Sequence, residues 1–464
     1  MEQRAGEKIM LSLKVFGLAG FIVLSSSAMS LSQALAQAPV DEAPSPQQIL
    51  IQNVRIWDGT SDEAVPNQDL LVEGHLIKAI GPDVSAHPTA ETIDGTGLFL
   101  MPGIIDAHTH LASPVNPLIR TQEDTFYIAA VSLRAARLYL MRGWTTMRDL
   151  GGPSQGLGRA IDAGHAIGPR VYPSAATISQ TAGHGDRRGR TDPHPNMTGM
   201  RNLASERYSR LADGPDEVRR AVRESLRQGA VQIKLTAGGG ISSDFNPIDS
   251  LQFSLEELKA AVEAASDWGT YVTVHAYTDG SVNRALDAGV KVIEHGHLLS
   301  EPTLRRIKKE GAYLSSQSFG FVREMQTNSN SARARKSQMV MNGVDTMMTT
   351  AKRIGLPVAF GTDTFGSLET YRRGVKEFTY RKRWFDSLEI LKQATSHNAK
   401  LLELTGLRNP YPDGPLGVIE EGAYADLLLV DGDPLSDASI LEDYENTIKL
   451  IMKDGHIYKN TLTP

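Results

Sequence analysis

Eight short apolar segments of this chain are each followed by a stretch in which apolar residues recur at helical spacing. Strands that alternate with helices are typical of a parallel sheet with helices packed against it. Eight such units in a chain of 464 residues indicate a (β/α)8 barrel of the TIM type. The predicted strands cover residues 98–105, 145–149, 170–175, 231–235, 271–275, 291–295, 313–317 and 357–361.

A doubly wound open sheet is the alternative arrangement for the same alternation. Polar residues recur at the carboxyl end of successive predicted strands, as the active site of a barrel requires. We therefore expect an α/β protein whose barrel spans residues 100–412.

Short strand-like runs without helices between them lie at both ends of the predicted barrel. They occupy residues 49–99 and 413–464 and are separated by Gly and Asp turns. Neither end holds enough strands for a domain of its own. We predict that the two ends together form one small β-sandwich domain.

The N-terminal segment 1–36 has the features of a secretory signal peptide. Lysines flank the start of an apolar run over residues 15–24, and a small-x-small cleavage pattern ends at Ala36. The run is short for a membrane span, although an uncleaved N-terminal anchor is the alternative. We expect a flexible mature N-terminus over residues 37–48, a periplasmic or secreted protein, and no membrane attachment after cleavage.

The chain contains no cysteine and has a formal net charge of −6 at pH 7. The lack of cysteine excludes disulfides, thiolate nucleophiles and zinc sites with Cys ligands, so a metal must be held by histidine, carboxylates or a modified lysine. The net charge gives no sign that the protein binds nucleic acid or an anionic membrane.

Two histidines end the first predicted strand of the barrel, in the run PGIIDAHTH at residues 102–110. Because side chains alternate along a strand, His108 and His110 point the same way. Two neutral imidazoles that converge at a strand end suit a divalent metal such as zinc. A His-x-His pair alone is weak evidence, since most such pairs are exposed polar residues.

Four further strand ends carry residues of the types that ligate metals. Alone, Lys234 would be interpreted as a lysine whose stem lies along apolar surface. His275 or His295 could each be a hydrogen-bonded core histidine, and Asp363 could cap the next helix. In a barrel, however, the carboxyl ends of the strands meet at one mouth. The joint pattern predicts one centre with ligand-type residues His108, His110, Lys234, His275, His295 and Asp363.

This pattern, with the PGIIDAHTH opening and the split β domain, resembles the amidohydrolase superfamily of metal-dependent hydrolases. The resemblance covers nearly the whole chain after the signal peptide, and it implies two divalent metal ions. Zinc is favoured by His and carboxylate ligands, although manganese or cobalt would fit the same site. The resemblance implies that the more buried metal is held by His108, His110 and Asp363, and the more exposed one by His275 and His295.

Lys234 would, by the same resemblance, be carboxylated by carbon dioxide and bridge both metals. The chemistry agrees, because a lysine in an apolar strand has a lowered pKa, which favours the free amine that reacts. The two metals would share a hydroxide that attacks an amide carbon. Asp363 would take the hydroxide proton and pass it to the leaving nitrogen.

Two loop segments carry a closer resemblance, to the Xaa-Pro/Xaa-Arg dipeptidase-like group, which includes bacterial amidohydrolases that hydrolyse ochratoxin A. They are SQTAGHGD at residues 179–186 and LTAGGGI at residues 235–241. The resemblance implies release of a C-terminal amino acid from dipeptides or N-acyl amino acids, including cleavage of ochratoxin A to ochratoxin alpha and phenylalanine. The chain departs from the group at Ala182, where glycine is frequent, and at Tyr277, where a second histidine is common.

Four residues of these loops and strand ends are candidates for contact with the substrate. His184, between two glycines, could donate to the carbonyl oxygen, although it could also be a surface histidine. Arg187 could bind a substrate carboxylate through its guanidinium group, or simply be solvated. Tyr277 lies just beyond a predicted metal ligand, and exposed N–H groups around Gly239 could form a carboxylate nest.

Other functions stay open at this stage. A cyclic-amide hydrolase would keep Lys234, and only the loops oppose it, whereas deaminases of the superfamily usually lack the bridging lysine. A periplasmic metal-binding protein without turnover would be expected to lose Asp363 or Lys234, and both are present. The expected partner is a small-molecule amide or peptide rather than nucleic acid. The resemblance also implies a homo-oligomer, with an octamer as one form.

Overall fold

The structure, a computed structural model, describes residues 47–116, 122–199, 203–243, 245–318 and 331–462. The predicted signal peptide and almost all of the predicted flexible N-terminus lie outside the described residues. The first strand, β1, begins at Gln48. Within the described ranges, no helix is long and apolar enough to cross a membrane.

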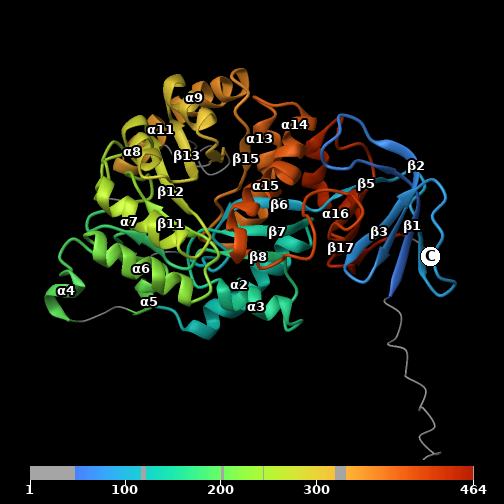
Figure 1. Cartoon of the computed structure of the whole chain (residues 1–464), viewed down its shortest axis with the longest axis horizontal. Coiled ribbons are helices and arrows are strands. Elements are labelled where there is room, and N and C mark those ends of the chain that lie inside the picture. The colour runs from blue at the N-terminus through green and yellow to red at the C-terminus, as the bar shows by residue number, and fades with distance from the viewer. Residues whose placement is uncertain (1–46, 117–121, 200–202, 244, 319–330, 463–464) are drawn as a thin grey trace, which may run out of the picture. The chain divides into compact units, whose positions relative to one another are not determined.

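The strands of the barrel form two parallel sheets, with the orders β6-β7-β8 and β10-β9-β11-β12-β13-β14-β15 (Figure 1). A strand is present at each of the eight predicted places, but the first, predicted over residues 98–105, is divided at Gly103. Its first part, β5 Phe99–Pro102, pairs within the sheet of the chain ends, and only β6 belongs to the barrel. The short strands β9 and β10 were not predicted. The bounds are β6 Ile104–Thr109, β7 Trp144–Asp149, β8 Arg170–Pro173, β9 Thr177–Ser179, β10 Ser209–Leu211, β11 Ile233–Thr236, β12 Val272–Thr278, β13 Val292–Leu298, β14 Tyr313–Ser316 and β15 Val358–Phe360.

Hydrogen bonds outside these ladders link the two parallel sheets at both seams. Between β15 and β6, the N–H groups of Thr362 and Asp363 donate to the carbonyl of His108, at 3.2 and 2.7 Å. Between β8 and β11, the side-chain amide of Gln232 donates to the carbonyl of Tyr172 at 2.7 Å. The predicted TIM-type barrel is confirmed, and one seam runs directly through the residues predicted to bind metal.

Helices follow the barrel strands and pack outside them (Figure 1). A capping box at Ser254 and Glu257 starts α7, which buries a face containing Leu258 and Ala261. The longer helices are α2 Thr125–Leu140, α3 Gln155–Asp162, α6 Pro215–Arg227, α7 Leu255–Ser266, α8 Asp279–Asp287, α9 Glu301–Lys309 and α11 Ala332–Arg353. The shorter ones are α4 Pro195–Thr198, α5 Leu203–Glu206, α12 Leu368–Arg373, η1 Gly374–Lys376, α13 Glu377–Arg381, α14 Ser387–Lys392, η2 Gln393–His397, α15 Asn398–Leu402, η3 Glu403–Arg408, η4 Ala438–Asp443 and α16 Tyr444–Thr447.

The two chain ends share one sheet, in which the blue strands of the first part and the red strands of the last part are neighbours (Figure 1). β1 pairs with β4 along its first half and with β5 along its second half. The ends of the chain meet where β16 pairs antiparallel with β5. The prediction of a small β domain built from both ends is confirmed. Its strands are β1 Gln48–Ile56, β2 Val65–Glu73, β3 Leu76–Gly81, β4 Glu91–Asp94, β5 Phe99–Pro102, β16 Leu427–Val430, β17 Ile448–Lys453 and β18 His456–Asn460.

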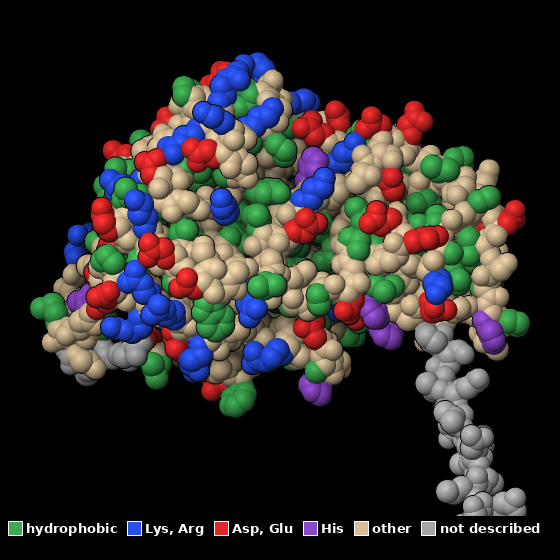
Figure 2. Space-filling model, in the orientation of Figure 1, with side chains coloured by type: hydrophobic (Ala, Val, Ile, Leu, Met, Phe, Trp, Pro, Cys, Tyr) green, Lys and Arg blue, Asp and Glu red, His purple; other side chains and the backbone are tan. Residues whose placement is uncertain are grey.

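The surface carries charges of both signs. Figure 2 shows Lys and Arg side chains interspersed with Asp and Glu over the face drawn. This face therefore presents no single-sign field that would select a highly charged polymer.

Candidate active site

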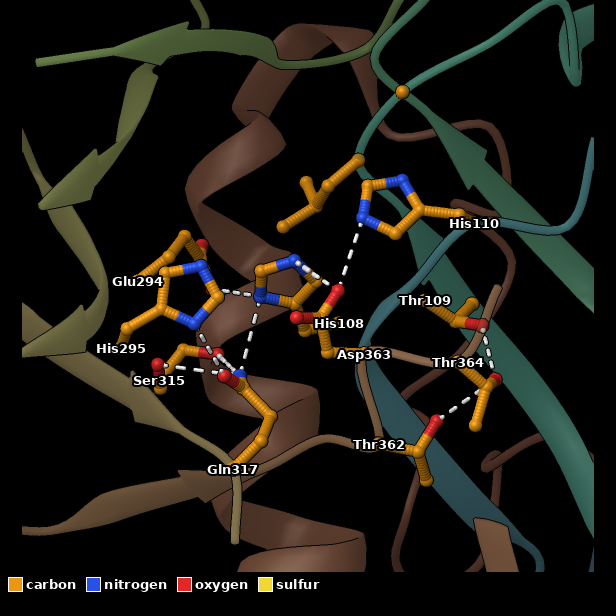
Figure 3. Close-up of polar contacts among 12 residues, drawn as sticks. His108, Thr109, His110, Glu294, His295, Ser315, Gln317, Thr362, Asp363 and Thr364 are labelled. Carbon is orange, nitrogen blue, oxygen red and sulfur yellow. Dashed lines mark hydrogen bonds and ion pairs between the residues drawn. The ribbon is translucent and has the colours of Figure 1, made fainter. Parts of the chain in front are cut away.

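The six predicted ligand residues lie in or just after β6, β11, β12, β13 and β15. Ligand atoms of His108, His295 and Asp363 all lie within 4.8 Å of one another. One oxygen, Asp363 Oδ1, is 3.4 Å from His108 Nε2 and 3.1 Å from His110 Nε2 (Figure 3). The ring of His275 lies 4.6 Å from that of His295. The group formed by His108, His295 and Asp363 could therefore bind a metal ion.

Lys234 is the strongest sign that the centre is built for a metal. Its side chain is buried, and its ammonium has no hydrogen-bond partner among the residues that the structure describes. Burial lowers the pKa of Lys234 to about 8. Because an unpaired buried charge is costly, this amine is poised to become neutral or to be modified. The donor set fits a divalent metal with a carboxylated lysine.

Burial keeps three of the predicted ligand histidines neutral, as metal ligands must be. It lowers the pKa of His108 to about 4 and that of His275 to about 3, and it moves the pKa of His295 in the same direction. The Nε2 atom of His275 lies 3.0 Å from the carbonyl oxygen of Gly239. A carbonyl can only accept, so Nε2 carries the hydrogen and the lone pair of Nδ1 is left for a ligand.

A buried ion pair holds His108 from behind. Glu294, in β13, accepts from His108 Nδ1 at 2.8 Å and from Arg148 Nη2 at 2.6 Å (for the histidine, see Figure 3). Thr273 adds a third hydrogen bond to the same carboxylate at 2.5 Å. Burial raises the pKa of a carboxyl, but the Arg148 guanidinium outweighs it and holds the pKa of Glu294 well below its usual value. The ionised carboxylate fixes the Nδ1–H form of His108, so Nε2 faces Asp363.

A second buried acidic residue, Asp106, fixes the backbone next to Asp363, and burial raises its pKa to about 7. Asp106 accepts from the backbone N–H of His108 at 3.0 Å and from the Thr362 hydroxyl at 2.6 Å. Gly361 lets β15 approach β6 closely, since a Cβ there would lie 2.8 Å from His108 Cβ. Burial raises the pKa of a carboxyl, yet the neighbouring histidines and lysine hold the pKa of Asp363 below its usual value. Asp363 is therefore a carboxylate that can accept a proton.

His184 lies beside the predicted ligands. Its ring stacks on that of His275 at 4.2 Å, and a Cβ on Gly240 would lie 1.9 Å from His184 Nδ1. No described residue accepts from or donates to this Nδ1 atom. Tyr277 is buried against the same centre, with its ring 4.9 Å from that of His275. The structure thus brings the predicted donor His184 and the predicted contact residue Tyr277 to one side of the ligand cluster.

The predicted carboxylate nest on the glycine run is wrong for Gly239 and Gly240. The N–H of Gly239 donates to the Ser250 carbonyl at 3.3 Å, and that of Gly240 to Asn246 Oδ1 at 2.9 Å. Lys336, in α11, holds the same loop from the other side through carbonyl oxygens, including that of Asn246 at 2.5 Å. Both N–H groups donate to acceptors within the loop and are not available to a substrate. Gly239 instead accepts a hydrogen bond from His275 through its carbonyl oxygen.

Arg187 is exposed on the loop that carries His184, and its Nη1 donates across to the carbonyl of Ser242 in the glycine loop at 3.1 Å. Arg333, from the start of α11, donates to the same carbonyl at 3.2 Å. Arg188, in contrast, is paired with Asp186 at 2.6 Å. Two guanidinium groups thus donate to one neutral oxygen. The pKa of His184 is lowered mainly by burial, then by His275, and then by the positive charge of Arg187.

Sequence reasoning missed Glu294 and Gln317, which contact predicted ligands, and Arg148, which pairs with Glu294. Gln317 follows β14 and accepts from His295 Nδ1 at 2.9 Å (Figure 3). A usable signal was present for two of them, because a charged residue inside an apolar barrel strand must face other barrel residues. Asp149, at the end of β7, accepts from the N–H of Leu111 just after the histidine pair, at 2.5 Å.

Comparison with known proteins gives a consistent result. The Amidohydrolase family pattern matches residues 99–458. Ochratoxinase of Aspergillus niger is 31% identical over 397 residues, which cover 78% of this chain and 75% of that protein. A crystal structure of A. niger ochratoxinase matches with a TM-score of 0.77 at 26% identity, over 90% of this chain and 97% of that one.

Two solved peptidase structures are also similar. A prolidase complexed with N-methylphosphonate-L-proline gives a TM-score of 0.82 at 31% identity, over 89% of this chain and 100% of that one. A Xaa-Pro dipeptidase with bound methionine gives 0.75 at 28% identity, over 89% and 100%. The chain therefore belongs to the amidohydrolase family and is an enzyme that hydrolyses amide or peptide bonds.

Proposed function

We propose that this enzyme holds two divalent metal ions, with zinc favoured, and releases a C-terminal amino acid from dipeptides or N-acyl amino acids, including phenylalanine from ochratoxin A. The observation that carries the proposal is the buried Lys234 amine without a described partner, together with the group of possible metal ligands formed by His108, His295 and Asp363. Its carbamate would be an anion able to bridge two cations. When bound, the two metals supply Lewis-acid activation of water and of the amide carbonyl.

The chain's own residues would move the proton and hold the oxygen. Asp363, as a carboxylate, accepts the proton of the attacking water and returns it to the leaving nitrogen. His184 remains neutral because burial lowers its pKa, so it carries one N–H that can donate to the substrate carbonyl oxygen. Burial raises the pKa of Tyr277, which stays protonated and can donate as well.

The free carboxylate of the leaving amino acid would meet Arg187 at the rim of the mouth. Its exposed guanidinium donates to the Ser242 carbonyl at the edge of the glycine loop, at 3.1 Å. Arg333 brings a second positive charge to the same oxygen. A carboxylate there would gain charge-assisted hydrogen bonds, which would favour substrates with a free C-terminus.

A matched pair of substrates tests this preference, namely N-acetyl-L-phenylalanine and its carboxamide. The carboxamide should have a kcat/KM at least about tenfold lower, as expected for one lost charge-assisted contact. Arg187→Met should lower the rate on the acid and leave the carboxamide unchanged. Arg190→Met is the matched control, because Arg190 lies on the same loop but over the ring of Phe245.

Equal rates on the two substrates would contradict the carboxylate contact. Activity confined to a cyclic amide such as dihydrouracil would favour the cyclic-amide hydrolase instead. Zinc content measured on the same preparation separates both results from a protein that binds metal without turnover.

A further inference from the structure

Gln317 lies beneath the ligand cluster, between the ligands assigned to the two different metals. It follows β14 directly, is completely buried and touches His108 and His295 (Figure 3). We propose that Gln317 is a positioning residue, which fixes the tautomer and ring orientation of His295 and thereby controls occupancy of the more exposed metal site. The consequence for metals rests on the proposed function, whereas the consequence for the tautomer does not.

The orientation of the Gln317 amide follows from its neighbours. Its Nε2 lies 3.3 Å from the carbonyl oxygen of Ser315 and 3.3 Å from the Ser315 hydroxyl. A carbonyl oxygen can only accept, so the NH2 group of the amide must face β14. Oε1 is then the atom at 2.9 Å from His295 Nδ1. The β14 backbone thus determines which end of the amide meets the histidine.

An amide oxygen in that position permits one form of His295. Since Oε1 can only accept, Nδ1 of His295 must carry the hydrogen, and the lone pair is left on Nε2. The ring of His295 faces those of His275 and His108, at 4.6 and 5.0 Å. Gln317 therefore turns the lone pair of His295 toward the cluster and away from the strands below it.

His108 does not depend on Gln317 in the same way. Gln317 Nε2 lies 3.1 Å from His108 Nδ1, but this nitrogen already donates to the ionised Glu294 at 2.8 Å. Two donors cannot form a hydrogen bond with each other, so Glu294 alone fixes His108. Loss of Gln317 should affect His295 and spare His108, which gives the proposal a site-selective signature.

The first measurement needs no metal. In the metal-free protein with 15N-labelled histidine, the His295 resonances should show a protonated Nδ1 in the wild type. In Gln317→Met, whose side chain has a similar length but no amide oxygen or nitrogen, they should show a mixture of tautomers. Ser316→Ala is the matched control, because Ser316 is the adjacent residue and its buried hydroxyl has no described partner. A wild-type His295 protonated on Nε2 would overturn the proposal.

The second measurement is a chelator competition with zinc on the same three proteins. One zinc ion should bind to Gln317→Met as tightly as to the wild type, and the second should bind about 10–100-fold more weakly, the range for loss of a residue that orients a metal ligand. Equal loss of both ions would mean a general loosening of the barrel and would overturn the proposal. A wild type that takes up only one ion would instead contradict the proposed two-metal function, while the tautomer measurement still decides the role of Gln317.

Discussion

Removal of the buried lysine should stabilise the metal-free protein and destabilise the metal-loaded one. Burial lowers the pKa of Lys234 from its ordinary value of 10.5 to about 8. At about 1.4 kcal/mol for each pH unit, the charged lysine costs the folded state roughly 3 kcal/mol. Lys234→Met removes the charge and keeps an apolar side chain of similar length. The metal-free variant should therefore be more stable than the metal-free wild type at pH 7.

The size of the effect is measurable by thermal unfolding. A chain of 464 residues gains about 1 kcal/mol/K of entropy on unfolding, so roughly 3 kcal/mol raises the midpoint by about 3 °C. The pH dependence has a definite sign. Below pH 8 the lysine is protonated in both states and the folded state bears the whole cost. Between pH 8 and 10.5 the folded state is neutral while the unfolded state stays protonated, so the wild type gains stability and the advantage of the variant disappears.

The assay compares both proteins after dialysis against a chelator, at pH 7 and pH 10, and again after reloading with zinc and bicarbonate. After reloading, the wild type should be more stable than Lys234→Met, because only the wild type has the lysine that could form the proposed bridging carbamate. Lys453→Met serves as a control, since this buried lysine lies in the β domain near Asp426 and should respond equally with and without metal. A metal-free Lys234→Met that is less stable at pH 7, or a difference that does not change by pH 10, would refute the reasoning.

Three further predictions concern the proton shuttle, the buried ion pair and the N-terminus. Asp363→Asn should keep the fold and lower kcat by several orders of magnitude; a near-wild-type kcat would assign the shuttle elsewhere, with His184 the next candidate. Glu294→Gln leaves Arg148 charged and without its carboxylate, so denaturant unfolding should show a loss of about 3–5 kcal/mol, and an unchanged midpoint would mean that the pair is not buried in solution. N-terminal sequencing of protein from the native host should find a start near Gln37, and recovery of chains that begin at Met1 would count against a cleaved signal peptide.

The strands and the ligand types could be predicted because both depend on local sequence. In an apolar run that ends in His-x-His, strand alternation alone places both histidines on one face. In a (β/α)8 barrel the carboxyl ends of all strands lie at one mouth, so ligands from distant strands meet there. The partners of those ligands could not be predicted, because they depend on which side chains meet across the barrel. Glu294 and His108 are 186 residues apart. The prediction of a carboxylate nest at Gly239 was wrong for a related reason. Asn246 and Ser250 fold back onto the loop and accept the hydrogen bonds of its N–H groups.

One local irregularity explains how adjacent residues can both serve the site. Strict alternation would place Glu294 and His295 on opposite faces of β13. His295, however, has a φ of 74°, and the pairing of β12 with β13 shifts by one residue just beyond it, so that Ala276 pairs with His295 but Thr278 pairs with Leu298. An extra residue in one strand re-aims side chains in the manner of a β-bulge. The left-handed backbone at His295 costs on the order of 1–3 kcal/mol, and it turns the ligand toward the barrel mouth while Glu294 stays in the interior, bonded to His108. The strain thus allows one short segment of β13 to supply both His295, the proposed ligand of the more exposed metal, and the carboxylate that orients His108.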